Sequence, residues 1–201
     1  MEHLTPLTQE NELELGNASV IFKGDYQRIF RYIRSMVHDT AEAEDLTQDT
    51  FLRAFHRRDS LRDEGAQTTW LYRIATHICY DRLRQYARRN PRESENDIDQ
   101  LDVPEQNTPS LQKIIEQNEM SDCVQRYLNN LPDRYRAVIL LHDMHELTSP
   151  EIAQLLSESL ASVKIRLHRA RIKLRSALEA GCNFSYDDNN VLTCESRDQM
   201  D

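Results

Sequence analysis

One strongly basic, amphipathic segment constrains the fold of this chain more than any other. The segment 162–175 reads SVKIRLHRARIKLR and contains six Lys or Arg residues, one His and no acid. Its apolar residues recur at steps of three or four, which is the period of an α-helix that buries one face. The remaining residues must then form a basic helical surface. The residues predicted to face inward are Val163, Leu167, Ala170 and Leu174.

The residues before this helix have the pattern of a helix-turn-helix. In TSPEIAQLLSESLAS, Thr148 and Glu151 form a capping box, and Pro150 falls in the first turn, where its missing N–H costs little. A short helix therefore runs to about Leu156, and a turn leads into the basic helix. Such a helix fits the major groove of DNA, and its exposed residues are the candidate DNA contacts. These candidates are Ser162, Lys164, Ile165, Arg166, His168, Arg169 and Arg171.

Charge is segregated along the chain, whose formal net charge is −9. Residues 1–20 carry four acids and no base, residues 93–119 carry eight acids and one Lys, and residues 179–201 carry six acids and one Arg. The positive remainder lies in two helical blocks, roughly 22–92 and 121–178. An acidic protein gains from a concentrated cationic helix only where that helix meets an anion such as phosphate.

The acidic segment between the two blocks, residues 93–119, has two Pro and no sustained apolar period. This composition predicts an extended, flexible linker between two small helical domains. Phosphate would repel a linker of this charge, so it does not lie on the DNA that the domains bind. Alternatively, the linker is simply soluble and disordered.

The first block predicts three helices. The second begins at Asp39, with Glu42 completing a capping box, and the third runs from about Thr68 to Arg89. Trp70 is interpreted as a core residue rather than as a side chain that stacks on a DNA base. The predicted inward residues are Phe22, Tyr26, Ile29, Phe30, Ile33 and Val37, then Ala43, Leu46, Thr47, Thr50, Phe51, Ala54 and Phe55, then Leu71, Ile74, Ala75, Ile78 and Cys79.

The outer face of the third helix combines basic side chains with an aromatic one. Arginines neutralise phosphate and rings stack on exposed bases, so this combination suits single-stranded or melted nucleic acid. The pattern equally fits an ordinary solvated basic face. The residues on this face are Arg73, His77, Tyr80, Arg84 and Arg88.

Two stretches give the chain a specific resemblance. AEAEDLTQDTFLRAFHRRDSLR followed by TTWLYRIATHICYDRLRQYARR resembles region 2 of bacterial sigma factors of the extracytoplasmic-function (ECF) type, and the C-terminal block resembles sigma region 4. The resemblance implies an all-α fold in which a region 2 helical bundle and a region 4 helix-turn-helix are joined by the acidic linker. The implied parts are an acidic arm 1–20, a region 2-like domain 21–92, the linker 93–119, a region 4-like domain 120–179 and an acidic two-cysteine tail 180–201.

The resemblance also implies roles for individual residues. Region 2 of the family docks on the clamp helices of the largest polymerase subunit, which implies core binding by Asp45, Gln48, Asp49 and Leu52. The family captures flipped bases of the minus-ten element, which implies DNA contacts by Arg62, Thr69, Arg73, His77, Tyr80, Arg84 and Arg88. Its region 4 reads the minus-thirty-five element and meets the polymerase flap, and its linker occupies the active-site and exit channel.

Three residues depart from the family pattern at turns. Ser157 and Glu158 stand where the family often has Gly and an aliphatic residue, and Glu146 stands where Gly is frequent. These departures bear on the geometry of the turns and not on the order of the helices.

The four cysteines lack the close C-x-x-C spacing of a zinc site, so no metal or cofactor is expected. Cys79 and Cys123 are interpreted as small buried hydrophobes. Cys182 and Cys194 in the tail are candidates for sensing metal or oxidant, and the alternative is an incidental acidic tail.

The resulting interpretation is an alternative sigma factor that binds core RNA polymerase and promoter DNA, under restraint by an anti-sigma factor or the tail. A free-standing helix-turn-helix regulator is the alternative. An enzyme is not expected, because the HDMHE string at 142–146 lacks the two His four residues apart that a zincin needs. No apolar run reaches the ~20 residues of a membrane span and no signal peptide is evident, so a cytoplasmic protein without membrane insertion is expected.

Overall fold

The computed structural model of the chain describes residues 22, 24–37, 39–61, 63–89, 122–186 and 192–196. The chain divides into two compact units, Met1–Arg89 and Asn90–Asp201. The predicted arm 1–20 and linker 93–119 lie outside the described residues. Each unit is helical, so the prediction of an all-α fold with two small helical domains is confirmed, and a β-hairpin is added in the second unit.

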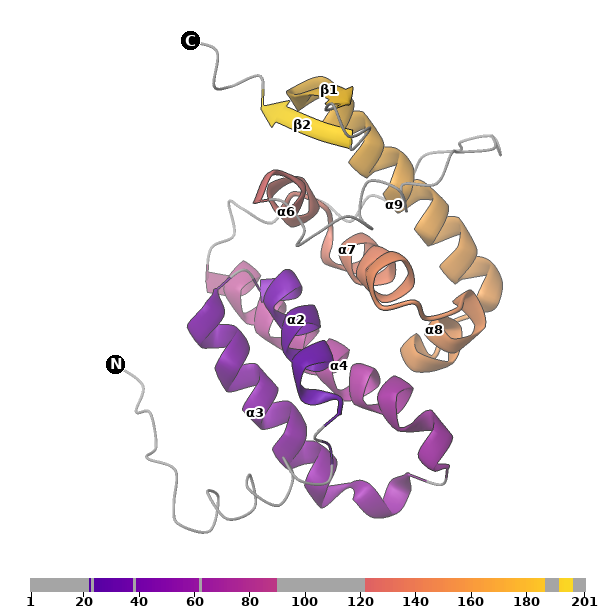
Figure 1. Cartoon of the computed structure of the whole chain (residues 1–201). Helices are drawn as coiled ribbons and strands as arrows, with labels where there is room; N and C mark the ends of the chain where they lie inside the picture. Colours follow the sequence, from indigo (N-terminus) through magenta and orange to yellow (C-terminus); the bar gives the residue numbers. More distant parts are fainter. Residues whose placement is uncertain are drawn as a thin grey trace. The chain divides into compact units, whose positions relative to one another are not determined.

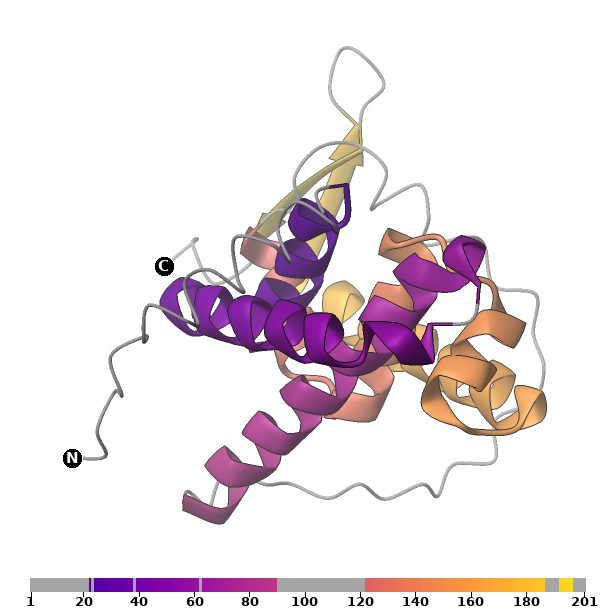
Figure 2. The same cartoon turned by 90° about the horizontal axis from the view of Figure 1, so that it is seen from below.

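Three helices form the described part of the first unit. They are α2 (Tyr26–Val37), α3 (Thr40–His56) and α4 (Gln67–Arg89), and each packs against the other two (Figure 1). Figure 2 shows α3 running across α2 and α4. Two short 3₁₀ turns, η1 (Arg58–Ser60) and η2 (Glu64–Ala66), lead from α3 to α4.

Aromatic side chains fill the space between these helices. The rings of Tyr32 and Tyr72 meet edge to face, with centroids 5.3 Å apart, and those of Phe22 and Phe51 lie 5.8 Å apart. Thr76 Oγ1 donates to Tyr72 O at 2.7 Å, so the Tyr32 hydroxyl is the donor in its 2.8 Å bond to Thr76 Oγ1. This satisfied hydroxyl pair lets two polar groups lie inside an apolar core.

Most of the predicted inward residues of the first unit are buried, including Cys79. Trp70 is half-buried, and the centroid of its ring lies 6.4 Å from that of Phe22. This position agrees with the interpretation of Trp70 as a core residue. The single-stripe prediction for α2 is incomplete, because α2 packs against both α3 and α4 and therefore also buries Tyr32 and Met36. Four predicted inward residues are only half-buried: Tyr26, Phe30, Leu46 and Phe55.

The predicted capping box at the start of α3 forms only in part. Asp39 caps the helix, because its carboxylate accepts from the Glu42 N–H at 2.7 Å. The Glu42 carboxylate does not return to the cap. It accepts instead from Arg82, in a short contact, and from the Tyr86 hydroxyl at 3.0 Å, both on α4. Glu42 therefore joins α3 to α4.

The described residues of the second unit form four helices and a π-helical turn. These are α6 (Asp122–Asn129), α7 (Asp133–Ile139), the π turn η3 (Leu140–Met144), α8 (Ser149–Leu156) and α9 (Leu160–Gly181). The long helix α9 packs against α6, α7 and α8 (Figure 1). The side chain of Cys123 in α6 is not among those described.

A buried arginine closes the end of α6. Arg136 on α7 is only 4% exposed, and its guanidinium donates to the carbonyl oxygens of Leu128, Asn129 and Leu131 at 3.1, 2.9 and 3.1 Å. The last carbonyls of a helix have no partner within the helix. Arg136 supplies that partner and so fixes the turn between α6 and α7.

An antiparallel β-hairpin follows α9 directly, formed by β1 (Cys182–Tyr186) and β2 (Leu192–Ser196). The segment 180–201, predicted only as an acidic two-cysteine tail, therefore contains two strands. The alternation in CNFSY and the turn residues DDNN are strand and turn signals that predict such a hairpin. Gly181 ends α9 where a Cβ atom would overlap the Tyr127 hydroxyl, so any larger residue would have to displace the Tyr127 ring.

Candidate nucleic-acid interface

The helix-turn-helix of the second unit begins and turns by local hydrogen bonds. The predicted capping box is confirmed, since Thr148 N donates to Glu151 Oε2 at 2.7 Å and Glu151 N donates to Thr148 Oγ1 at 3.5 Å. At the end of α8, Ser157 has φ 57°, and Glu158 N donates back to Ala153 O at 2.9 Å. This is the Schellman ending that turns the chain from α8 into α9.

Two residues in the described part have a left-handed φ without being glycine. They are Ser157 and Glu146, with φ values of 57° and 58°. Both stand where the resemblance leads one to expect Gly, so the turns form in the expected conformation with residues that tolerate it less well. Each left-handed residue costs about 1–2 kcal/mol relative to Gly.

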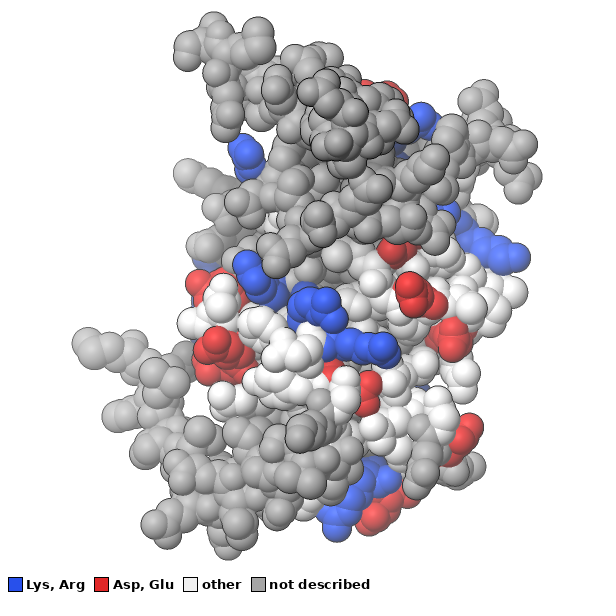
Figure 3. Space-filling view, viewed as in Figure 1, with Lys and Arg blue, Asp and Glu red and all other residues white. Residues whose placement is uncertain are grey.

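The buried stripe of α9 fixes how the helix is rotated about its axis. Ser159 caps the helix by accepting from Ser162 N at 3.1 Å. All four predicted inward residues are buried, together with Leu178, so the opposite face of α9 points away from the core of the second unit. Figure 3 shows Lys and Arg side chains interspersed with Asp and Glu side chains on one face of the described residues.

The predicted DNA contacts on α9 do not form one uniform surface. Lys164 and Ile165 are exposed, and Ile165 is 53% exposed. His168 and Arg169 are half-buried. The Ser162 hydroxyl lies 2.8 Å from the Ser159 hydroxyl, so it belongs to the helix cap.

Two of the predicted contact arginines are held by acids of the same unit. Arg166 Nη1 lies 2.6 Å from Glu158 Oε2, and the Arg166 side chain is only 13% exposed. Arg171 Nε donates to Asp143 Oδ2 at 3.0 Å. These two arginines anchor α9 to the turn and to η3, so they are less available to DNA than the sequence prediction assumes.

Asp143 is the centre of a compact network on η3. Its side chain is 1% exposed, and both Arg171 and His142 Nδ1, at 2.8 Å, contact its carboxylate. Burial alone would raise the pKa of Asp143, but hydrogen bonds from His142 and Arg171 outweigh it and lower the pKa below the ordinary value. A carboxylate that is charged and paired here ties the start of the helix-turn-helix to the middle of α9.

In the first unit, most basic residues predicted on α4 lie on one accessible face. Arg73, His77, Arg84 and Arg88 are exposed, while Thr69 and Tyr80 are half-buried. Arg84 lies 3.4 Å from Asp81, an exposed pair that leaves the cation accessible. Arg62 lies outside the described residues.

The predicted polymerase-binding residues all lie on α3. Asp45 is exposed, and Gln48, Asp49 and Leu52 are half-buried. Asp49 accepts from Arg53 Nε at 3.0 Å, one turn further along the helix. The four side chains therefore belong to one helix, with Asp49 already paired locally.

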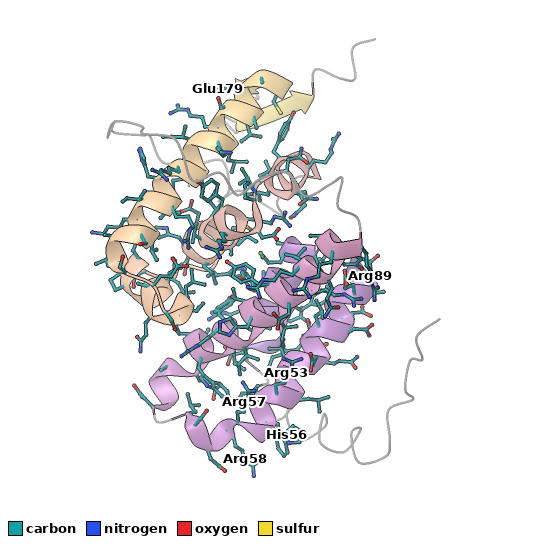
Figure 4. All side chains as sticks on the ribbon, turned by 180° about the vertical axis from the view of Figure 1, so that it is seen from behind. Arg53, His56, Arg57, Arg58, Arg89 and Glu179 are labelled. Atoms are coloured by element: carbon teal, nitrogen blue, oxygen red, sulfur yellow. The ribbon has the colours of Figure 1, made fainter. Side chains whose placement is uncertain are left out.

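Two basic clusters were not predicted from the sequence. Arg28, Arg31 and Arg34 are exposed at steps of three on α2. A second cluster, whose side chains are labelled in Figure 4, lies at the end of α3. Its Arg58 guanidinium lies over the Phe55 ring, 4.6 Å from the ring centroid. Recurrence of Arg at helical steps is the signal that identifies the first cluster. The second cluster is Arg53, His56, Arg57 and Arg58.

The register of the hairpin offsets the two tail cysteines along the strands. The hairpin pairs Cys182 with Ser196 and Phe184 with Cys194, so the two cysteines are not directly opposite one another. Cys182 is buried. Among the side chains that the structure describes, no group of three or more His, Cys, Asp or Glu is placed to hold a metal ion. The described helices also include none long and apolar enough to cross a membrane.

Comparison with known proteins identifies relatives of both units. The family model for sigma-70 region 2 matches residues 21–89, and the model for sigma-70 region 4 matches residues 121–174. The ECF RNA polymerase sigma factor SigW of Bacillus subtilis is 31% identical over 161 residues, which cover 75% of this chain and 83% of SigW. RNA polymerase sigma factor YlaC of the same organism is 31% identical over 156 residues, covering 77% of this chain and 88% of YlaC.

The fold is likewise similar to that of a solved structure. The sigma factor RpoE of Bartonella quintana, crystallised with the anti-sigma factor NepR, matches with a TM-score of 0.60 at 22% sequence identity. The match covers 80% of this chain and 96% of that one.

Proposed function

Since the chain belongs to the ECF sigma factors of the sigma-70 family, we propose that it binds core RNA polymerase and directs initiation at a limited set of promoters. Each helical unit would contact a different promoter element. The single observation that carries this proposal is the outer face of α9, a cationic surface that follows a complete helix-turn-helix in a protein of net charge −9.

The second unit would read the minus-thirty-five element with the first turns of α9. Lys164 and Ile165 are the exposed members of the predicted set, with His168 and Arg169 beside them. The Lys164 and Arg169 cations would contact phosphate or guanine, the commonest partners of basic side chains in the major groove. Ser162, Arg166 and Arg171 would act mainly by holding α9 in place, since each has a partner within the unit.

The first unit would hold the minus-ten element along α4. Exposed arginines at helical spacing can follow a single strand, and an aromatic side chain among them can stack on a base. The residues assigned to this surface are Thr69, Arg73, His77, Tyr80, Arg84 and Arg88, with Arg62 beside them in sequence.

Core polymerase would dock on α3 through Asp45, Gln48, Asp49 and Leu52. Carboxylates beside an apolar residue suit a basic partner helix, because charge complementarity orients the partner and Leu52 adds buried area. In this assignment the partners are the clamp helices of the largest subunit, the flap for the second unit, and an anti-sigma factor like that bound to RpoE. The protein would act in the cytoplasm and have no catalysis of its own.

The parts of the chain would divide as the sequence suggests. We assign minus-ten and polymerase binding to 21–92, minus-thirty-five binding to 120–179, and a polymerase-channel role to the linker 93–119. The assignment of the linker rests on its charge, which is the same sign as that of nucleic acid. The acidic arm 1–20 and the tail 180–201 receive no role in initiation.

Run-off transcription with purified core polymerase on a promoter library tests the proposal. Specific starts should appear only when the full chain is added. If no specific start depends on the added chain, and the chain alone shifts duplex DNA in a gel, the protein is instead a free-standing regulator.

Two matched pairs of variants separate the proposed surfaces. Lys164→Ala should weaken promoter binding, whereas Arg175→Ala, which removes the same charge from an exposed residue paired with Glu179, should not. Asp45→Ala should weaken binding to core polymerase, whereas Glu44→Ala, also exposed on α3, should have little effect.

A further inference from the structure

The exposed face of α9 has an apolar residue at its centre. Ile165 is 53% exposed, more than any other large hydrophobic side chain that the structure describes. Ala161, one turn earlier, is also exposed, and Ile172, two turns later, is half-buried. Ile165 thus belongs to an apolar line along a helix otherwise rich in Lys and Arg.

The buried stripe shows that this line faces directly away from the core. An α-helix turns about 100° per residue, so Ile165 lies about 200° around the axis from Val163, which is fully buried. By the same geometry Lys164 lies about 100° from Val163 and Arg169 about 240°. The exposed isoleucine is therefore flanked by a cation on each side.

This layout matches the two kinds of surface that a major groove presents to a helix. The flanks of an inserted helix meet the two phosphate backbones, and its outermost line meets the edges of the bases. Those edges consist mainly of hydrogen-bond donors and acceptors, and their largest apolar group is the C5-methyl group of thymine, since cytosine has only a hydrogen at C5. An isoleucine at the centre of the face gains most buried apolar area against that methyl group.

We infer that Ile165 is a specificity-determining residue that recognises the C5-methyl group of a thymine in the duplex element bound by α9. The inference rests on the proposed function, because it takes α9 as the helix that enters the groove. It requires at least one A·T pair, oriented with its thymine methyl toward α9, in the upstream element of every strong promoter. Lys164 contributes affinity beside it that does not depend on the methyl group.

Replacing thymine by uracil tests the inference, because this change removes one methyl group and preserves base pairing. Holoenzyme made from core polymerase and the full chain first selects duplexes from a randomised library. Each thymine of the selected upstream element is then replaced in turn. At one position uracil should weaken binding about fourfold, the equivalent of one buried methyl group.

Variant holoenzymes then assign the effect to a residue. With Ile165→Ala, thymine and uracil should bind equally at that position, since the side chain that contacts the methyl group is gone. With Lys164→Ala, overall affinity should fall while the fourfold preference for thymine remains. Circular dichroism of Ile165→Ala should match the wild type, because the side chain is exposed and outside the core.

Three outcomes would overturn the inference, and they are distinguishable. If every uracil substitution is neutral, no methyl group is recognised. If the thymine preference survives in Ile165→Ala, another residue recognises the methyl group. If the holoenzyme selects no sequence at all, the proposed function itself fails, and this assignment fails with it.

Discussion

Replacing Asp143 by Asn should destabilise the second unit and leave the first unit unchanged. Asn keeps the shape of the side chain but removes the charge that Arg171 and His142 contact. The variant therefore leaves a guanidinium facing a neutral group inside the unit. The free energy of unfolding should fall because the ion pair between Asp143 on η3 and Arg171 on α9 is lost.

The magnitude follows from the exposure of the three side chains. Removing one partner of a fully buried ion pair costs about 3–5 kcal/mol. Asp143 is 1% exposed, but Arg171 is 30% exposed and His142 31%, so water can partly solvate them in the variant. The free energy of unfolding of the second unit should fall by about 2 kcal/mol, which lowers a urea midpoint by about 1–2 M.

The single tryptophan makes the assay specific for each unit. Trp70 lies in the first unit, so its fluorescence follows unfolding of that unit, while far-ultraviolet circular dichroism follows both. In urea, Asp143→Asn should lower the midpoint of the second-unit transition, which circular dichroism detects and Trp70 fluorescence does not. The Trp70 transition is the internal control.

Acid should reduce the same contribution in the wild type. The pKa of Asp143 is lowered in the folded state, so its stabilisation is present above the unfolded pKa and is lost as pH falls through the folded value. The second unit of the wild type should thus lose stability below about pH 4, and Asp143→Asn should show less of this acid-dependent loss.

Two results would refute this reasoning. One is an unchanged urea midpoint in Asp143→Asn. The other is additivity in a double-mutant cycle with Arg171→Gln, because residues that interact directly should cost less together than the sum of the single changes.

The remaining predictions concern local geometry. Ser157→Gly should raise the melting temperature of the second unit, since relief of its left-handed φ should contribute about 0.5–1 kcal/mol after the greater chain entropy of Gly is counted; an unchanged or lower melting temperature contradicts this. Gly181→Ala should destabilise the unit by about 1–3 kcal/mol through overlap with Tyr127, and Tyr127→Phe in the same chain should restore part of that loss in urea unfolding. Tyr32→Phe should cost the first unit about 1 kcal/mol, read from Trp70 fluorescence, because the bond to Thr76 is lost; no change would mean that this buried bond is energetically neutral.

The sequence predicted those features of the candidate interface that depend on helical period and local hydrogen bonds. The inward residues of α9 and the capping box at Thr148 follow from spacing alone, and both are confirmed. The same period identified Lys164 and Ile165 as exposed. The rotation of a helix is thus readable from its apolar stripe.

Contacts between distant residues could not be predicted in this way. Arg171 appeared available to DNA, but its partner Asp143 lies 28 residues earlier in the chain. Glu42 appeared to complete a cap, but its partner Arg82 lies 40 residues later. Spacing shows which side of a helix a charge occupies and does not show which acid from another helix faces it.

The anchoring of α9 by Asp143 has a consequence for how promoter choice changes. The residues that would meet bases lie in the first turns of the helix, whereas the pair with η3 and most of the buried stripe lie further along. Substitutions in the early turns can therefore alter which sequence is bound at little cost in folding. The exposed positions that would meet bases are concentrated in the first half of the helix and its anchoring residues continue through the second, so related proteins can diverge in target while keeping the same scaffold.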